Sequence, residues 1–121
     1  MDLKAQSTIL LIGNDTTLSY LLGRFAERNG NQLATSSENL SIKQIELANP
    51  AVIIFTSTEL LATNRALVEE LSSLDILIVV CSSVAEEGRA RELGADHCLL
   101  HPLTYNDFQT AMVLASTSKR T

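Results

Sequence analysis

Three side chains with the chemistry of a reactive site each follow an apolar run of this sequence: Asp15, Cys81 and His101. A thiol with an imidazole beside it can act as a nucleophile, and a carboxylate can orient the imidazole or help to bind a metal. No recognisable oxyanion feature or further metal ligand accompanies them. A small enzyme that uses Cys81 and His101 is therefore an alternative hypothesis, and a metal site is not expected.

Each of the three also has an ordinary structural role open to it. Asp15 precedes a helix predicted to start near Thr17, where Asp is a favoured N-cap residue. A buried cysteine such as Cys81 commonly behaves as a small hydrophobic residue. His101 precedes Pro102, and this dipeptide shapes the loop after a strand. We favour these structural roles for all three residues.

The other polar residues near the apolar runs do not match a nucleotide-binding loop. The turn at residues 13–15 belongs to neither G-x-G-x-x-G nor G-x-x-x-x-G-K-[ST]. Hydroxyl side chains are frequent after the later apolar runs, where they are typical of helix caps. They are Ser57, Thr58, Ser82 and Ser83.

Five strands are predicted to position these side chains. Three of them are continuous apolar runs, which indicate strands buried on both faces of a parallel sheet. The predicted strands are residues 8–12, 32–35 (a polar edge strand), 51–55, 76–80 and 97–100. Cys81 would end one strand and Cys98 would begin the next. We therefore expect these cysteines at opposite ends of the sheet and do not expect a disulfide.

Helices are predicted between the strands from apolar stripes and capping signals. The first carries an apolar stripe from Leu18 to Phe25 and ends at Gly30. Capping boxes at residues 41–44, 83–86 and 104–107 each open another helix. The remaining expectations are one continuous helix over residues 59–72, a helix end at Leu93 before Gly94, and a final stripe of Phe108, Ala111, Met112 and Ala115.

This alternation of strands and helices predicts a three-layer α/β/α fold. We expect one domain over residues 1–121, with its core at about 8–115 and tails at 1–7 and 116–121. Ligands of such folds bind at the carboxyl ends of the strands. The residues expected there are Gly13, Asn14, Asp15, Thr56, Ser57, Cys81, Ser82, Ser83 and His101.

The composition restricts the partners and the compartment. The net charge of −5 disfavours a nucleic-acid partner, because phosphate binding needs clustered Lys and Arg. No apolar run approaches the roughly 18 residues that span a bilayer, and residues 1–7 lack the apolar segment of a signal peptide. Two cysteines are too few for a disulfide framework. We therefore expect a cytoplasmic protein with no membrane partner.

Residues 94–103 (GADHCLLHPL) resemble the end of the receiver domains of bacterial two-component response regulators, where the usual pattern is Gly-Ala-Asp-Asp-Tyr-Leu-x-Lys-Pro-Phe. Residues 9–15 are similar to the first strand and acidic turn of receivers, and residues 50–55 to the strand that presents their phosphoacceptor. The resemblance covers residues 8–115. It implies a flavodoxin-like sheet of five parallel strands in order 2-1-3-4-5 and a cis bond before Pro102.

The chain departs from that pattern where receivers are phosphorylated. The phosphoacceptor Asp of the family corresponds to Thr56, whose hydroxyl cannot form an acyl phosphate. The two acids that hold Mg²⁺ in the family correspond to Gly13 and Asn14, so only Asp15 remains in this turn. We expect no tight Mg²⁺ binding and no cofactor in this degenerate pocket.

The other parts of the phosphorylation device are altered as well. The Ser or Thr that follows the fourth strand in the family falls at Val80, Cys81 or Ser82. The family's Lys corresponds to His101, and a neutral imidazole supplies no fixed positive charge. The aromatic residue that switches rotamer in receivers corresponds to Cys98, which has no ring.

The resemblance and these changes together predict a non-catalytic pseudo-receiver that acts by protein–protein contact. Its partner would be a histidine kinase, an output domain or another signalling protein, and a homodimer is a further option. The resemblance implies docking through the fourth helix, last strand and last helix, with Arg89, Tyr105 and, unless it is core, Phe108. Two alternatives stay open: a receiver-like sensor of a small ligand or of oxidation at Cys81, and the Cys/His enzyme.

Overall fold

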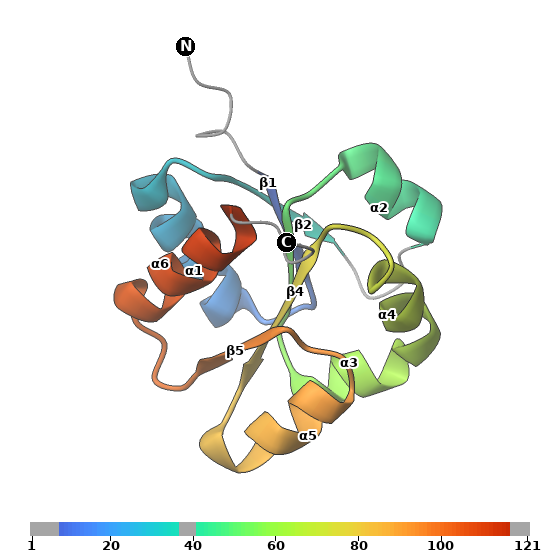
Figure 1. Ribbon diagram of the computed structural model, residues 1–121. Coiled ribbons are helices and arrows are strands. Elements are labelled where there is room, and N and C mark those ends of the chain that lie inside the picture. Colours follow the sequence, from blue (N-terminus) through green and yellow to red (C-terminus); the bar gives the residue numbers. More distant parts are fainter. Residues whose placement is uncertain (1–7, 37–40, 117–121) are drawn as a thin grey trace.

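The sheet at the centre of the molecule has five parallel strands in the order β2-β1-β3-β4-β5 (Figure 1). The computed structural model describes residues 8–36 and 41–116. The strands are β1 (Thr8–Ile12), β2 (Gln32–Ser36), β3 (Val52–Phe55), β4 (Leu77–Ser82) and β5 (His97–Leu100). This confirms the predicted flavodoxin-like α/β/α fold and its strand order.

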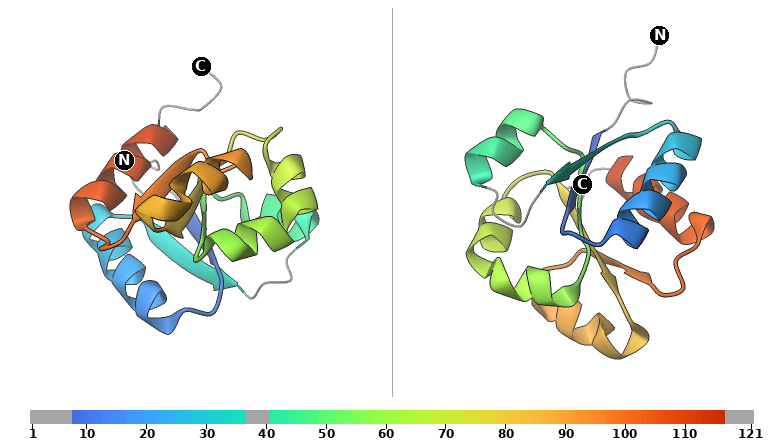
Figure 2. Two further views of the ribbon diagram at one scale, coloured as in Figure 1. Left: turned by 90° about the horizontal axis from the view of Figure 1, so that it is seen from below. Right: turned by 180° about the vertical axis from the view of Figure 1, so that it is seen from behind.

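Helices cover both faces of this sheet (Figures 1 and 2). One layer consists of α1 (Thr16–Asn29) and α6 (Tyr105–Ser116). The other layer consists of α2 (Ile42–Ala48), α3 (Thr58–Thr63), α4 (Arg65–Leu71) and α5 (Glu87–Glu92), the last preceded by a 3-10 turn at Val84–Glu86. Within the described residues, no helix combines the length and apolar character needed to cross a membrane.

The inner strands are apolar throughout because successive side chains enter different helical layers. In β1, Ile9 and Leu11 pack in the cluster that contains α1 and α6 residues, whereas Leu10 and Ile12 pack with the other helices. All four are buried. Burying such a side chain completely contributes about 1.5–3 kcal/mol, which is why uninterrupted apolar runs mark these strands.

Several predicted helix ends are confirmed by their hydrogen bonds. Asp15 accepts from the backbone N–H of Leu18 at 3.0 Å, and Gly30 ends α1 in the left-handed conformation (φ 81°). Both hydrogen bonds of the capping box between Ser41 and Gln44 are present at the start of α2. These local signals fix where the chain turns back toward the next strand.

Two helix predictions were wrong. The expected helix over residues 59–72 is divided at Asn64, where φ is −111° and ψ is 35°. The Asn64 side chain donates to the carbonyl of Leu60 at 2.8 Å, so it ends α3 instead of continuing the helix. Ser83 makes no capping hydrogen bond, and a 3-10 turn follows it before α5 begins.

The placement of the two cysteines was also predicted wrongly. β4 continues to Ser82, two residues beyond its predicted end, and Val80 is therefore the register partner of Cys98. Cys81 and Cys98 lie on neighbouring strands and not at opposite ends of the sheet. They belong to different core clusters on opposite faces, and both are free and buried. The two thiols are kept apart because their side chains point to opposite faces of the sheet, and not because they lie at opposite ends of it.

Candidate functional site

The candidate site lies at the edge of the sheet where the parallel strands end. Hydrogen bonds of the sheet extend by one residue beyond the strands there, because the N–H of Thr56 donates to the carbonyl of Ile12 at 3.1 Å. The N–H of His101 likewise donates to the carbonyl of Ser82 at 3.2 Å. These bonds place Thr56 beside the end of β1 and His101 beside the end of β4.

Gly13 and Thr56 are packed tightly against each other at this edge. Gly13 is buried and has φ of +137°, a conformation that side chains other than glycine rarely adopt. A Cβ atom at Gly13 would overlap Oγ1 of Thr56 and lie 2.8 Å from its Cγ2. Thr56 is only 8% exposed. A carboxylate side chain therefore has no room at position 13 while Thr56 is present.

A shallow pocket opens beside Thr56, with a volume of about 350 Å³. Its lining carries hydroxyls, one amide and one carboxylate: Asn14, Thr56, Ser57, Glu59, Leu60 and Thr63. The Ser57 hydroxyl is engaged as the N-cap of α3, where it accepts from the N–H of Leu60 at 3.2 Å. Glu59 is an acid that the sequence analysis did not place here. Its position in the first turn of a helix after β3 was the available signal.

Asp15 is exposed and does not line this pocket. Its carboxylate is used as the N-cap of α1, as the structural interpretation of the sequence predicted. Glu59 is thus the single carboxylate of the pocket lining. Within the described ranges, no group of three or more His, Cys, Asp or Glu side chains is arranged to hold a metal ion. The donor set at this edge does not fit a Mg²⁺ cage.

Cys81 lies beside Thr56 but inside the core. The register pairs Phe55 with Val80, so the next residues, Thr56 and Cys81, are neighbours on the same face, and Val80 and Ser82 point to the other. Cys81 is 2% exposed. Burial raises the pKa of the Cys81 thiol to about 12, and the negative charge of Asp15 adds to this shift. The thiol is therefore protonated at neutral pH, which is unfavourable for a nucleophile.

His101 does not form the partnership with Cys81 that an enzyme would need. Its side chain is exposed after the end of β5, and within the described residues no hydrogen bond joins it to Cys81. The peptide bond from His101 to Pro102 is cis, as predicted. The structure brings Gly13, Thr56 and Cys81 together, and it leaves the His101 side chain exposed after the end of β5.

Two buried hydroxyls near the strand ends lack ordinary partners. Thr58 and Ser82 are each 2% exposed, and neither hydroxyl oxygen makes a hydrogen bond of ordinary geometry to a described residue. Ser82 lies beside Cys98, whose thiol is only a weak hydrogen-bonding group. Burial raises the pKa of Cys98 as well.

The structure leaves fewer residues exposed for the docking face predicted on the fourth helix, last strand and last helix. Arg89 is exposed on α5, but Phe108 is fully buried core. Tyr105 is half-buried and its ring packs edge-on against Phe25 of α1 at 5.7 Å between ring centroids. Two of the three expected docking residues thus serve the packing of α6 on α1.

Comparisons with known proteins bear on the fold. No protein-family model matches the chain, and no curated protein matches it. Among solved structures, a response regulator receiver domain from Clostridium thermocellum is similar, with a TM-score of 0.71, 18% identity, and coverage of 92% of this chain and 94% of that chain. The N-terminal domain of the lantibiotic response regulator NsrR is also similar, with a TM-score of 0.72, 21% identity, and coverage of 91% of this chain and 97% of that chain.

A third similar structure is the CheY-like protein tadZ from Pseudomonas aeruginosa, with a TM-score of 0.74, 12% identity, and coverage of 91% of this chain and 99% of that chain. At such low identities the likeness shows a shared fold. The function must be argued from the residues at the strand ends and on the surface.

Proposed function

We propose that this chain is a receiver-like signalling domain of the two-component type that is not phosphorylated and acts through contact with another protein. The likeness of the fold to receiver domains supports the signalling part of this proposal. One observation carries the rest: at the end of β3 stands a buried threonine, and it is packed against a glycine where the family has an acid.

The chemistry of phosphoryl transfer gives this observation its weight. A receiver takes a phosphoryl group onto a carboxylate, and Mg²⁺ and a lysine neutralise the charge that develops. In this chain Thr56, Gly13 and Asn14 are neutral, and the exposed His101 replaces the lysine. The pocket therefore lacks both the acceptor and the positive charge that the reaction needs.

The proposed partner is a histidine kinase, an output domain or another signalling protein, and a second copy of the chain is a further option. We place the protein in the cytoplasm, because two cysteines are too few for the disulfide framework that is typical of small secreted domains. No catalytic role is proposed, since the buried Cys81 thiol and the exposed His101 do not form a nucleophilic pair.

One observation favours a second candidate, a receiver-like domain that senses a small ligand. The pocket beside Thr56 has a volume of about 350 Å³, with hydroxyls and the Glu59 carboxylate in its lining. Such polar groups could orient a small polar molecule. Oxidation of Cys81 as the input is not favoured, because its thiol is buried and protonated.

Incubation with acetyl phosphate and Mg²⁺, followed by intact-mass measurement, tests the proposed function. We expect no gain of a phosphoryl group in the wild-type chain, while an ordinary receiver treated in parallel gains one. Thr56→Ala is the matched variant and should behave like the wild type. A phosphoryl group that appears on the wild type and is absent from Thr56→Ala would contradict the proposal.

A further inference from the structure

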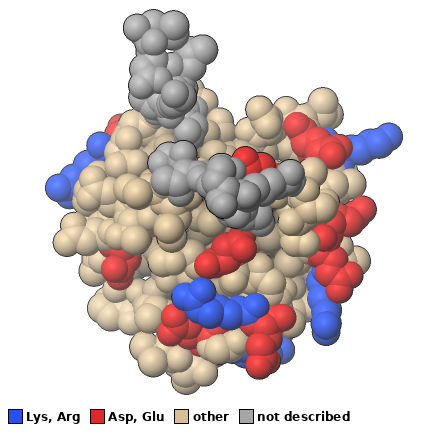
Figure 3. Space-filling model, in the orientation of Figure 1, with Lys and Arg blue, Asp and Glu red and all other residues tan. Residues whose placement is uncertain are grey.

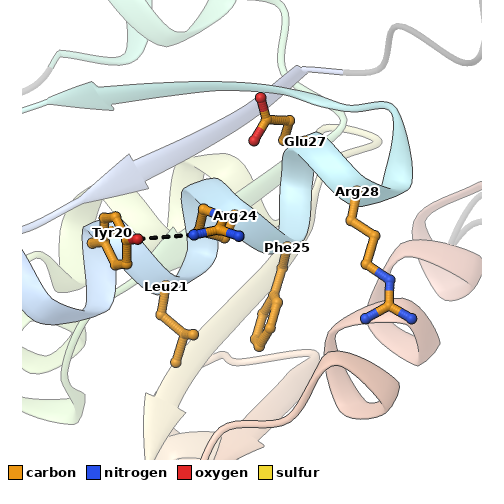
Figure 4. A pocket seen from close by; sticks show the side chains of 6 residues that line it. All are labelled: Tyr20, Leu21, Arg24, Phe25, Glu27 and Arg28. Carbon is orange, nitrogen blue, oxygen red and sulfur yellow. Dashed lines mark hydrogen bonds between the residues drawn. The ribbon is translucent and has the colours of Figure 1, made fainter.

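A second pocket lies on α1 and has a volume of about 480 Å³. All of its lining residues come from this one helix: Tyr20, Leu21, Arg24, Phe25, Glu27 and Arg28 (Figure 4). We call Tyr20, Leu21, Arg24, Phe25 and Arg28 the α1 surface. It combines two guanidinium groups with apolar side chains.

Aromatic rings hold both guanidinium groups in place. Arg24 donates to the hydroxyl of Tyr20 at 2.8 Å, and its Cζ lies 5.8 Å from the centre of that ring. Arg28 lies over the ring of Tyr105, with 4.0 Å from its Cζ to the ring centre. The Tyr105 hydroxyl in turn donates to Oδ1 of Asn29 at 3.2 Å. These contacts limit the rotation of two otherwise flexible cations before any partner binds.

Neither arginine is neutralised by an acid. In the described part of the chain the ion pair that forms joins Arg91 to Glu87 on α5, and none involves Arg24 or Arg28. Glu27 is in the same turn of α1, but it points to the other side of the helix from Phe25 and Arg28 (Figure 4). With Glu27 counted, the pocket lining carries two arginines and one glutamate, a net charge of +1, on a chain whose net charge is −5.

Most of the acidic side chains in the described helices lie in the other helical layer. Over the half of the molecule that carries α2, α4 and α5, they are the more frequent charged groups in the view of Figure 3. The acids on or directly before these helices are Glu46, Glu69, Glu70, Glu86, Glu87 and Glu92. A long anionic polymer would meet this overall repulsion, whereas a short acidic segment could contact the α1 surface alone.

The geometry points to an acidic segment of a partner protein as the occupant of the α1 surface, with two carboxylates that pair with Arg24 and Arg28 and an apolar side chain that contacts Leu21 and Phe25. The arginines are four residues apart, or about 6 Å along the helix, which matches acids spaced one helical turn apart in the segment. Guanidinium groups pair with carboxylates in a bidentate geometry, through two parallel hydrogen bonds. This inference rests on the proposed function, because it names the kind of protein contacted.

A second copy of the chain fits this surface less well. A two-fold contact brings the same patch of each copy together, so four arginines would face each other with two Glu27 side chains to offset them. The excess positive charge would oppose such a contact.

Selection from a library of random peptides displayed on phage tests the inference, with the full chain as the immobilised target. We expect the enriched peptides to carry Asp or Glu together with an apolar residue. Their affinity for Arg24→Gln/Arg28→Gln should fall at least about tenfold, which corresponds to about 1.4 kcal/mol. Lys43→Gln/Arg65→Gln is the matched control, since it changes the net charge equally at exposed cationic residues outside the α1 surface and should leave affinity within about twofold.

A second measurement keeps the test valid if the double variant is poorly folded. Arg24→Lys/Arg28→Lys keeps both charges, so its affinity should lie between those of the wild type and the Gln variant. In the wild type, amide shifts in NMR spectra should be confined to residues 20–28 and the adjoining start of α6.

Several outcomes would overturn the inference. One is that the enriched peptides carry no acids, and another is that they bind Arg24→Gln/Arg28→Gln as tightly as the wild type. The others are amide shifts centred outside residues 20–28, and self-association of the wild type that Arg24→Gln/Arg28→Gln abolishes. The two proposals can fail separately. A chain that gains phosphate but selects acidic peptides contradicts the proposed function alone, and a chain that stays unphosphorylated but selects no acidic peptides contradicts this inference alone.

Discussion

The strand-end pocket and the α1 surface use their polar groups in opposite ways. At the strand ends, three of the polar groups have roles inside the protein: Asp15 caps α1, Ser57 caps α3, and Thr56 packs on Gly13. On the α1 surface, Arg24 and Arg28 are held by aromatic rings and have no acid beside them. The first region has the character of a structural element, and the second is the surface for which we propose recognition of a partner.

Under the proposed function, this difference accounts for signalling without a phosphoryl group. A fold provides sites independently of one another, so the loss of a reactive site leaves other surfaces intact. The rings that position Arg28 belong to the packing between α1 and α6, which also includes Phe25 and Phe108. Arg28 is therefore positioned by a ring that belongs to the core packing, which lowers the entropic cost of binding through this side chain, whereas Arg24 contacts the exposed ring of Tyr20.

The largest effect that would sharpen this comparison is expected at Gly13. Gly13→Ala should lower the free energy of unfolding by about 2–5 kcal/mol, because it adds a strained positive φ and an overlap with Thr56. Urea unfolding followed by circular dichroism measures the change. Adding Thr56→Gly in the same chain should recover part of the loss, because it removes the overlapping atoms but not the backbone strain.

The matched control for this substitution is Gly88→Ala in α5. Apart from its chain neighbours and the backbone of its own helix, no atom lies within 4 Å of a Cβ placed there, and alanine favours helix, so a small gain of up to about 1 kcal/mol is expected. If Gly13→Ala proved as harmless as Gly88→Ala, the strand-end pocket would have room for an acid after all. The contrast between the two regions would then fail.

The sequence predicts the inner strands well because each must be apolar on both faces, and short runs such as residues 51–55 are typical of strands buried in this way. It predicts the Asp15 cap for a similar reason, since the donor of that cap lies three residues away. Features that depend on a single competing hydrogen bond are missed. The leucine pattern of residues 59–72 continues through Asn64, although the Asn64 side chain ends the helix.

The candidate site was predictable only in part. Parallel strands bring Gly13 and Thr56 to one edge, and this follows from strand order alone. The contact between their atoms, which excludes an acid, depends on backbone angles that no sequence pattern specifies. The α1 surface was missed for another reason: Arg28 and Tyr105 are far apart in the chain, and their contact requires knowledge of how α6 packs on α1.

A smaller effect is expected from the buried thiol of Cys81. Its pKa is raised from 9.0 to about 12 by burial, so the folded state keeps the thiol protonated where the unfolded state ionises. The stabilisation is complete below about pH 9 and is lost as the pH rises toward 12. Between about pH 8 and 10.5, the wild type should lose about 2 kcal/mol more than Cys81→Ala in urea unfolding.

The comparison with Cys81→Ala removes the contributions of the other groups that titrate at high pH, including Cys98. Equal losses in the two chains would show that the thiol reaches solvent in the folded state. In that case Cys81 would be open to chemistry, and the oxidation-sensing alternative would regain support at the strand ends.

The smallest effect concerns the α1 surface itself and decides how the peptide experiment is interpreted. Arg28→Gln removes the cation above the Tyr105 ring and should cost about 0.5–1 kcal/mol of unfolding free energy. Arg28→Lys should cost less, since it keeps a cation there. Arg24→Gln should also cost less, because Arg24 lies farther from its ring, at 5.8 Å against 4.0 Å. Urea unfolding of the three variants checks this order.

A loss of several kcal/mol of unfolding free energy in Arg28→Gln would mean that the guanidinium mainly holds α6 on α1. Weaker peptide binding could then reflect a disturbed helix pair instead of a lost contact. A loss within the expected range leaves the folded surface in place, so that a tenfold drop in affinity measures recognition of the acidic segment.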